Sequence, residues 1–254
     1  MSPVYDTRDE AQLLSGMRHA RQAIGRGELI VLPTDTVYGI AANAFDAAAV
    51  ARLLEAKGRG REQPPPVLVA GVKTLRALVA EIPEPVERLV AEFWPGGLTI
   101  VLPSQPSLSW DLGDTRGTVA VRMPAHTLTL ELLEECGPLA VSSANLTGQP
   151  AAVSIDQARD MLNTSVEVYL DGGASETGIA STIIDATSLV GGTEPLVRVL
   201  REGAVSREQL REVLGDLLEP DPPLPGDEAA DSATDEADAV AEDDQADAAP
   251  GGSA

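Results

Sequence analysis

Apolar residues recur every three or four positions between residues 9 and 25, which is the spacing of one face of a helix, and Gly25 and Gly27 follow. The same spacing recurs after Asp46, Ser154 and Ser206, whose side chains are typical helix N-caps. Gln209 stands three residues after Ser206 and would complete a capping box. The pattern predicts helices over 9–25, 47–57, 73–80, 84–93, 127–135, about eight residues after Ser154, and the residues after Ser206.

Short runs rich in Val, Ile, Leu and Thr, bounded by Pro and Gly, separate these segments. Helices interleaved with buried strands indicate a layered α/β fold. Because the middle of the chain is richer in strands than in helices, we expect a mixed sheet instead of a purely parallel one. The expected strands are 28–32, 67–70, 98–103, 118–124, 138–143, 166–170, 181–187 and 195–200.

Charge divides the chain into two parts. Residues 216–254 contain 13 Asp and Glu and no Lys or Arg, which leaves 27 acidic and 18 basic residues in 1–215, a net charge of −9 out of −22 for the chain. The acidic segment also carries several prolines and no aromatic residue, so it cannot bury enough apolar surface to fold. We expect one folded domain over 1–215 and a disordered acidic tail over 216–254.

Several functional classes lack their sequence features. Cys136 is the single cysteine, the two histidines are far apart, and the chain has no phosphate-binding GxxxxGK[ST] loop and no GxSxG motif. We expect an intracellular, cytoplasmic protein with no metal site of its own. The N-terminus lacks an apolar signal segment, and no apolar run approaches the roughly 18 to 20 residues of a membrane span.

Polar loops that follow apolar strands carry the candidate chemistry. The segment VLPTDTVYGI places hydroxyl and carboxyl groups after one strand, VSSANLTGQP repeats the arrangement, and Arg122 ends a third strand. Lys57, one of two lysines, lies in KGRGR with Arg59 and is suited to a polyphosphate. Each loop by itself is also compatible with ordinary turn chemistry, and KGRGR with a basic helix end. Such loops gather ligands at one crevice in open α/β sheets.

Seven motifs in order, PTDTVYG, KGR, FWPGGLTIVL, TVAVRMPAH, SSAN, ASTIID and LREG, give the chain a specific resemblance. Over roughly residues 10–214 it resembles the YrdC-like family of L-threonylcarbamoyladenylate synthases, in a short form without the additional C-terminal domain. The resemblance implies a twisted open mixed sheet with flanking helices around a concave cavity. It also implies a nucleotidyltransferase that converts ATP, L-threonine and bicarbonate to threonylcarbamoyl-AMP and pyrophosphate, with Mg²⁺ bound to ATP. We expect no covalent enzyme intermediate, because neither Cys136 nor a paired Ser and His stands in a motif.

The product of that reaction would be used to modify adenosine 37 of tRNA. The implied partners are the proteins that transfer the threonylcarbamoyl group to tRNA, and tRNA itself could bind weakly as a second partner. By position, the threonine site would use Thr36, Arg122, Ser143 and Ser181. The ATP site would use Lys57, Arg59, Gln63, Thr118, Asn145 and Arg201, with Lys57 and Arg59 stabilising charge during the reaction. After KGR many relatives have a short stretch with Asn-Pro. This chain reads GREQPPP there, so Gln63 replaces the asparagine.

Two other interpretations remain open from the sequence. The same fold could act as a non-catalytic RNA-binding module, whose RNA affinity would fall steeply with salt. A carbamoyl-adenylate enzyme of the hydrogenase-maturation type is the second, although its acylphosphatase and zinc-finger modules are missing here.

Overall fold

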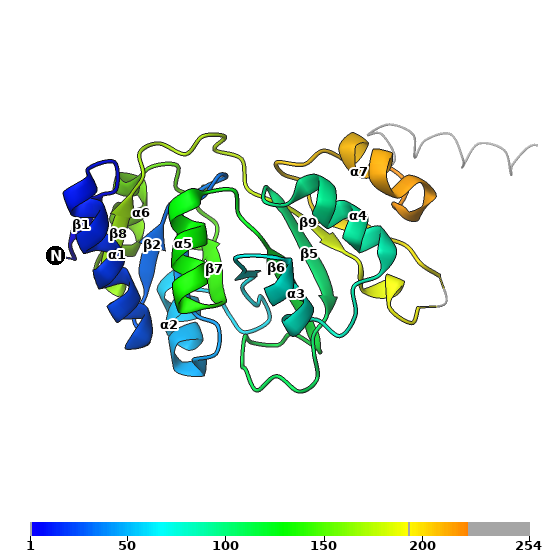
Figure 1. Cartoon of the computed structure of the whole chain (residues 1–254), viewed down its shortest axis with the longest axis horizontal. Helices are drawn as coiled ribbons and strands as arrows, with labels where there is room; N and C mark the ends of the chain where they lie inside the picture. Colours follow the sequence, from blue (N-terminus) through cyan, green and yellow to red (C-terminus); the bar gives the residue numbers. More distant parts are fainter. Residues whose placement is uncertain (1, 193, 223–254) are drawn as a thin grey trace, which may run out of the picture. The chain divides into compact units, whose positions relative to one another are not determined.

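Ten strands form one mixed sheet within residues 2–192 and 194–222, the part of the chain that the computed structural model describes (Figure 1). Neighbouring strands run parallel in the pairs β1/β8, β8/β2, β4/β6 and β5/β9 and antiparallel in the others, as expected for a mixed sheet. The order across the sheet is β1 (Val4–Asp6), β8 (Val168–Asp171), β2 (Ile30–Leu32), β3 (Gly39–Asn43), β7 (Leu139–Ser143), β4 (Val67–Leu68), β6 (Thr118–Arg122), β5 (Leu98–Pro103), β9 (Thr182–Asp185) and β10 (Arg198–Arg201).

Helices cover both faces of the half of the sheet that contains β1, β8, β2, β3 and β7 (Figure 1). On one face, α1 (Glu10–Gly25) and α5 (Thr127–Cys136) bury side chains against Ile30, Leu32 and Val141. On the other, α2 (Ala47–Lys57) and α6 (Ile155–Leu162) pack against Val31 and Ile40. Because successive strand residues point to opposite faces, β2 contributes to both cores.

The other half of the sheet is packed differently. Helices α3 (Val72–Leu78), α4 (Glu84–Phe93) and α7 (Arg207–Leu214) share one core with Leu98, Ile100 and Val121. The alternate residues of the same strands, such as Thr99 and Ala120, line a cavity on the opposite face. The two-residue period of the strands therefore supplies an apolar core on one side and a binding surface on the other.

The local sequence signals locate the helix ends well. The side chains of Asp9, Asp46 and Ser154 accept hydrogen bonds from the first-turn backbone, and Ser206 forms the expected capping box with Gln209. The C-cap of α2 is Gly58, in the left-handed conformation that lets its N–H bond back to the last turn. The predicted helices are confirmed, with ends within a few residues.

Two strands and one boundary differ from the prediction. Strands β1 and β3 were not expected, because VYD is very short and GIAAN has one β-branched residue in five. The folded unit extends to Glu219, not 215: Leu218 is 4% exposed and pairs with Val197, so its burial holds the segment in place. Of the expected tail, 223–254 lie outside the described residues. Among the described helices, none combines the length and apolar character needed to cross a bilayer.

Candidate active site

A cavity of about 500 Å³ lies on the face of the sheet opposite the α3, α4 and α7 core. Its walls come from the β2–β3 loop, the loop before β4, and strands β5, β6, β7, β9 and β10, which are far apart in the sequence. Eight of the ten residues assigned to the site by resemblance line it: Thr36, Arg59, Gln63, Thr118, Arg122, Ser143, Ser181 and Arg201. The expectation that the polar loops converge on one crevice is therefore confirmed.

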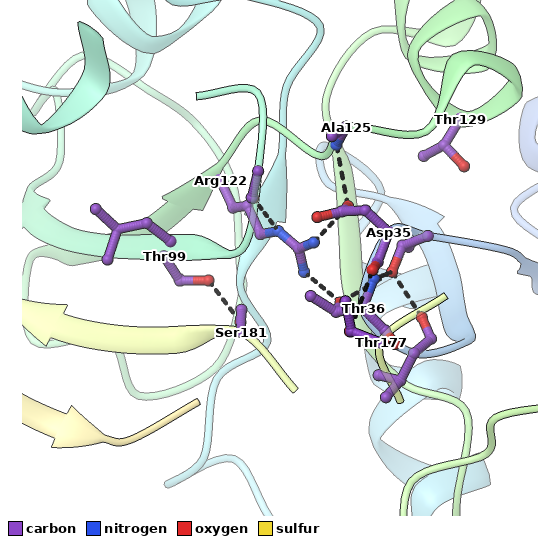
Figure 2. Close-up of polar contacts among 12 residues, drawn as sticks. Asp35, Thr36, Thr99, Arg122, Ala125, Thr129, Thr177 and Ser181 are labelled. Carbon is purple, nitrogen blue, oxygen red and sulfur yellow. Dashed lines mark hydrogen bonds and ion pairs between the residues drawn. The ribbon is translucent and has the colours of Figure 1, made fainter. Parts of the chain in front are cut away.

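Arg122 is held at the end of β6 by three hydrogen bonds. Its Nε donates to the carbonyl oxygen of Gly96 at 2.9 Å, its Nη1 to Thr36 Oγ1 at 2.9 Å, and its Nη2 to Asp35 Oδ1 at 2.6 Å (Figure 2). The residue is 6% exposed, so the guanidinium has little freedom to turn. Burial lowers the pKa of Arg122, while the carboxylate of Asp35 opposes that shift.

The β2–β3 loop is itself tied down by hydroxyl groups. Thr34 Oγ1 lies 3.0 Å from Thr36 Oγ1 and 2.6 Å from the carbonyl oxygen of Val37, to which it donates. Thr177, from the β8–β9 connection, donates to the carbonyl oxygen of Asp35 at 3.3 Å (Figure 2). The threonines of PTDT thus shape the loop as well as line the cavity.

A second polar group joins β5, β9 and β10. Thr99 Oγ1 and Ser181 Oγ lie 2.9 Å apart, and both residues are buried (Figure 2). Arg201 Nη2 donates to the carbonyl oxygen of Ser181 at 2.5 Å and to its Oγ at 3.0 Å. Ser181 is consequently fixed from both sides at the cavity wall.

Asp35 and Thr99 are two residues of this site that sequence reasoning missed. Asp35 stands between the two threonines of PTDT, and the sequence shows its carboxyl group but not the residue that it contacts. Thr99 lies within the strand LTIVLP, and the alternation of that strand could have placed it on the face opposite Leu98 and Ile100.

The lining is positively charged although the chain is acidic. Arg59, Arg122 and Arg201 line the cavity, and none of its lining residues is Asp or Glu. Partial burial lowers the pKa of Arg59 and of Arg201; the carboxylate of Glu62 opposes the shift of Arg59, and the proximity of Arg59 lowers the pKa of Arg201 further. Arg59 Nε is buried and has no hydrogen-bond partner among the described residues. An anionic ligand would supply both the missing partner and the missing negative charge.

The protein-family model Sua5/YciO/YrdC, described as telomere recombination, matches residues 22–203. The chain belongs to the Sua5/YciO/YrdC family. It is 52% identical over 215 residues to a putative threonylcarbamoyl-AMP synthase of Mycobacterium leprae, which covers 85% of this chain and 95% of the relative. It is 40% identical over 202 residues to the threonylcarbamoyl-AMP synthase of Pyrococcus abyssi, which covers 79% of this chain and 58% of that protein.

A solved structure of P. abyssi Sua5 complexed with L-threonine has the same architecture. The TM-score is 0.76 at 37% sequence identity, and the match covers 87% of this chain and 63% of that one. The expected twisted mixed sheet with flanking helices around a cavity is therefore confirmed for this Sua5/YciO/YrdC family member.

Lys57 and Asn145 are the two assigned residues of this family member that do not belong to the cavity lining. Lys57 is 2% exposed, and its Nζ donates to the carbonyl oxygens of Ser143 at 2.5 Å and Asn145 at 2.7 Å. Asn145 Nδ2 donates to the carbonyl oxygens of Leu146 and Gln149. In this arrangement Lys57 lies behind the wall and fixes the loop that carries Ser143.

Apolar groups complete the Sua5/YciO/YrdC cavity next to the basic ones. The proline run Pro64–Pro66 and the side chains of Leu112 and Leu200 line it. The β5–β6 connection that carries Leu112 is held to the loop before β4 by Arg61, whose Nη2 lies 2.8 Å from Asp111 Oδ1. A ligand with a flat apolar part and an anionic part would match this lining.

Proposed function

We propose that the protein is an L-threonylcarbamoyladenylate synthase that converts ATP, L-threonine and bicarbonate to threonylcarbamoyl-AMP and pyrophosphate. One observation carries the proposal. A single cavity contains Arg122, which is fixed and surrounded by hydroxyl groups, together with Arg59 and Arg201, which form no ion pair with a carboxylate among the described residues. An amino acid suits the first group and a triphosphate suits the second. The names of the relatives in M. leprae and P. abyssi support the same activity.

The threonine would bind at Arg122. A planar guanidinium matches a carboxylate, and the hydroxyls of Thr36, Ser143 and Ser181 are available along the same cavity for the amino and hydroxyl groups of the substrate. The P. abyssi relative, whose solved structure contains L-threonine, supports this assignment of the ligand.

The triphosphate would bind at Arg59 and Arg201. Both line the cavity, and Arg59 carries the buried Nε that lacks a partner. Gln63 and Thr118 lie on the same wall with the prolines and Leu112, so they would contact the nucleoside. Lys57 would add positive charge from behind Ser143, and Asn145 would act through the loop it shapes.

The reaction needs alignment and charge stabilisation more than a strong base. The threonine amine and bicarbonate give N-carboxythreonine and water, and its new carboxylate attacks the α-phosphorus of ATP while the bond to pyrophosphate breaks. Arg59 and Arg201 would stabilise the charge that develops on the leaving pyrophosphate, without a covalent enzyme intermediate. A bound Mg²⁺ supplies further neutralisation of the triphosphate charge.

A magnesium ion would arrive with the nucleotide, held by the substrate and not by a protein ligand cluster. Among the described residues, no group of three or more His, Cys, Asp or Glu side chains could hold a metal ion. Mg²⁺ keeps several water ligands and commonly binds through substrate phosphates, so the phosphate oxygens would hold it beside the hydroxyl groups of the cavity.

The product would be consumed by proteins that transfer the threonylcarbamoyl group to adenosine 37 of tRNA, in the cytoplasm. Direct tRNA contact remains a secondary proposal. A cavity of about 500 Å³ lined by three arginines suits a nucleotide and an amino acid, so it favours the enzyme over the RNA-binding module.

The test is pyrophosphate release from ATP with Mg²⁺ and bicarbonate, with and without L-threonine, together with mass-spectrometric detection of threonylcarbamoyl-AMP. We expect release that requires threonine and bicarbonate. Arg59→Gln should reduce it strongly, whereas Arg76→Gln, at an exposed ion pair with Glu87, should leave it unchanged. Absence of threonine-dependent release from folded protein would show that the proposal is wrong.

A further inference from the structure

We propose that Asp35 determines which ligand the Arg122 subsite accepts. Asp35 cancels the charge of Arg122 and fixes the direction of its guanidinium, so that the subsite takes the carboxylate of a zwitterionic amino acid and disfavours a phosphoryl group. The inference rests on the proposed function, which places the threonine carboxylate at Arg122. Asp35 is not among the cavity-lining residues, so it acts through Arg122 as a positioning residue.

The contacts of Asp35 join three segments. Its Oδ1 accepts from Arg122 Nη2 at 2.6 Å and from the backbone N–H of Ala125 at 3.0 Å, so the carboxylate links the β2–β3 loop to β6 and to the start of the α5 connection (Figure 2). The side chains of Asp35 and Arg122 are 13% and 7% exposed. At that burial the pair is shielded from solvent and holds one geometry.

The pair leaves part of Arg122 available to a ligand. A guanidinium has five N–H donors. Three have partners among the described residues, on Gly96, Thr36 and Asp35, which leaves one N–H on each of Nη1 and Nη2. Each of these two N–H groups can donate to a ligand oxygen, and a carboxylate offers two acceptor oxygens. Asp35 therefore orients Arg122 without displacing the substrate.

Charge separates this subsite from the rest of the cavity. Arg122 has a carboxylate at 2.6 Å. Arg59 and Arg201 belong to no ion pair within 4 Å among the described residues, and only the more distant carboxylate of Glu62 acts on Arg59. A zwitterion adds no net charge to the neutral Asp35–Arg122 pair. A phosphoryl group would instead bring net negative charge to a pair that Asp35 has already neutralised, which disfavours it there and leaves Arg59 and Arg201 as the better site for a polyanion.

Two variants separate charge from orientation. Asp35→Asn keeps an acceptor oxygen for Arg122 and Ala125 but removes the negative charge, and Asp35→Ala removes both. Threonine is titrated calorimetrically into full-length protein saturated with α,β-methylene-ATP, with and without inorganic phosphate. Because the nucleotide analogue occupies the Arg59 and Arg201 side, any competition by phosphate reports on Arg122.

In the wild-type protein phosphate should leave the threonine Kd unchanged. In Asp35→Asn phosphate should compete, and raise the apparent threonine Kd about tenfold. In Asp35→Ala the threonine Kd should itself rise about tenfold while the affinity for the nucleotide stays the same, because Arg122 loses its orienting hydrogen bond. Glu87→Gln, which removes the carboxylate of an exposed arginine pair, is the matched control.

The inference would be overturned if phosphate left the threonine Kd of Asp35→Asn unchanged, as in the wild type. It would also be overturned if Asp35→Ala bound threonine with normal affinity. Should Asp35→Ala fail to fold, the asparagine variant decides alone. A wild-type protein that does not bind threonine overturns the proposed function and this inference together. If the wild-type protein binds threonine but the Asp35 variants do not behave as expected, only the inference is overturned.

Discussion

The ammonium group of Lys57 lies 2.7 Å from the main-chain carbonyl oxygen of Asn145 and 3.3 Å from its Oδ1. A third oxygen, the carbonyl of Ser143, is 2.5 Å away. All three donors of the ammonium therefore have acceptors on one loop, at the end of β7. Lys57 contributes to the site by fixing this loop and by placing a positive charge directly behind it.

Lys57→Met should reduce both stability and activity. The methionine retains most of the buried apolar stem but leaves the carbonyl oxygens of Ser143 and Asn145 without their donor. We expect the free energy of unfolding to fall by about 1–3 kcal/mol, the cost of unsatisfied buried polar groups. Pyrophosphate release should fall about 100-fold, because the preorganised charge behind the cavity wall and the support of the Ser143 segment are both lost. Denaturant unfolding and the pyrophosphate assay measure the two effects.

Lys73→Met is the matched control, because Lys73 is the other lysine of the chain and is exposed on α3. It should leave both stability and activity unchanged. A Lys57→Met protein with wild-type activity would contradict the role given to the ammonium.

The pH dependence should report on the same group. Burial, with a smaller contribution from Arg59, lowers the pKa of Lys57 from 10.5 to about 8. The ammonium predominates below that value and is lost as the pH rises through it, so kcat/KM should decline above about pH 8. Between about pH 8 and 10.5 the unfolded chain holds the proton that the folded chain has lost, so the stability contribution of this residue should rise with pH.

The stability effect is read as the difference between the wild-type protein and Lys57→Met across that pH range, since other groups cancel in the difference. For activity, Lys57→Arg keeps its charge at high pH, so its decline should move to higher pH. An unchanged decline in that variant would assign the titration to another group.

Local signals in the sequence explain which parts of the fold could be predicted. The caps at Asp46 and Ser206 depend on residues within one helical turn, and the strand LTIVLP has the composition of a strand by itself, so the structure confirms all three. Strand β1 exists because Val4 and Tyr5 pair with Tyr169 and Leu170. The partner strand lies more than 160 residues away in the sequence, so the three residues of β1 contain no local pattern that predicts a strand.

Eight of the ten residues assigned from the sequence line the cavity, but the contacts within the site were not predictable. The motif order and the family resemblance that it carries placed Arg59, Arg122 and Arg201 in one site, and all three line the cavity. They did not indicate that Asp35 neutralises Arg122, or that Lys57 binds backbone carbonyls behind the wall, because both contacts join segments 86 to 88 residues apart. The sequence therefore indicates which groups a site contains more readily than which of them touch the ligand.

Thr99→Val should weaken threonine binding selectively. Valine has nearly the volume of threonine but lacks the hydroxyl that lies 2.9 Å from Ser181 Oγ. Because Ser181 keeps only its contacts with Arg201 on one side, we expect the KM for threonine to rise about threefold to tenfold and the free energy of unfolding to fall by about 1 kcal/mol. Steady-state kinetics with each substrate varied in turn would measure this. An equal rise in both KM values would contradict a selective effect.

Thr129→Val should test how α5 supports the β2–β3 loop. Thr129 is fully buried and its Oγ1 donates to the carbonyl oxygen of Pro33 at 2.5 Å, directly before the loop that carries Thr36. Valine fills the space but leaves that carbonyl unsatisfied, so the free energy of unfolding should fall by about 1–3 kcal/mol. The KM for threonine should rise while the KM for ATP stays constant. Thr127→Val, at an exposed position of the same helix, should change neither quantity; equal effects from both variants would show that the hydrogen bond to Pro33 is not what supports the loop.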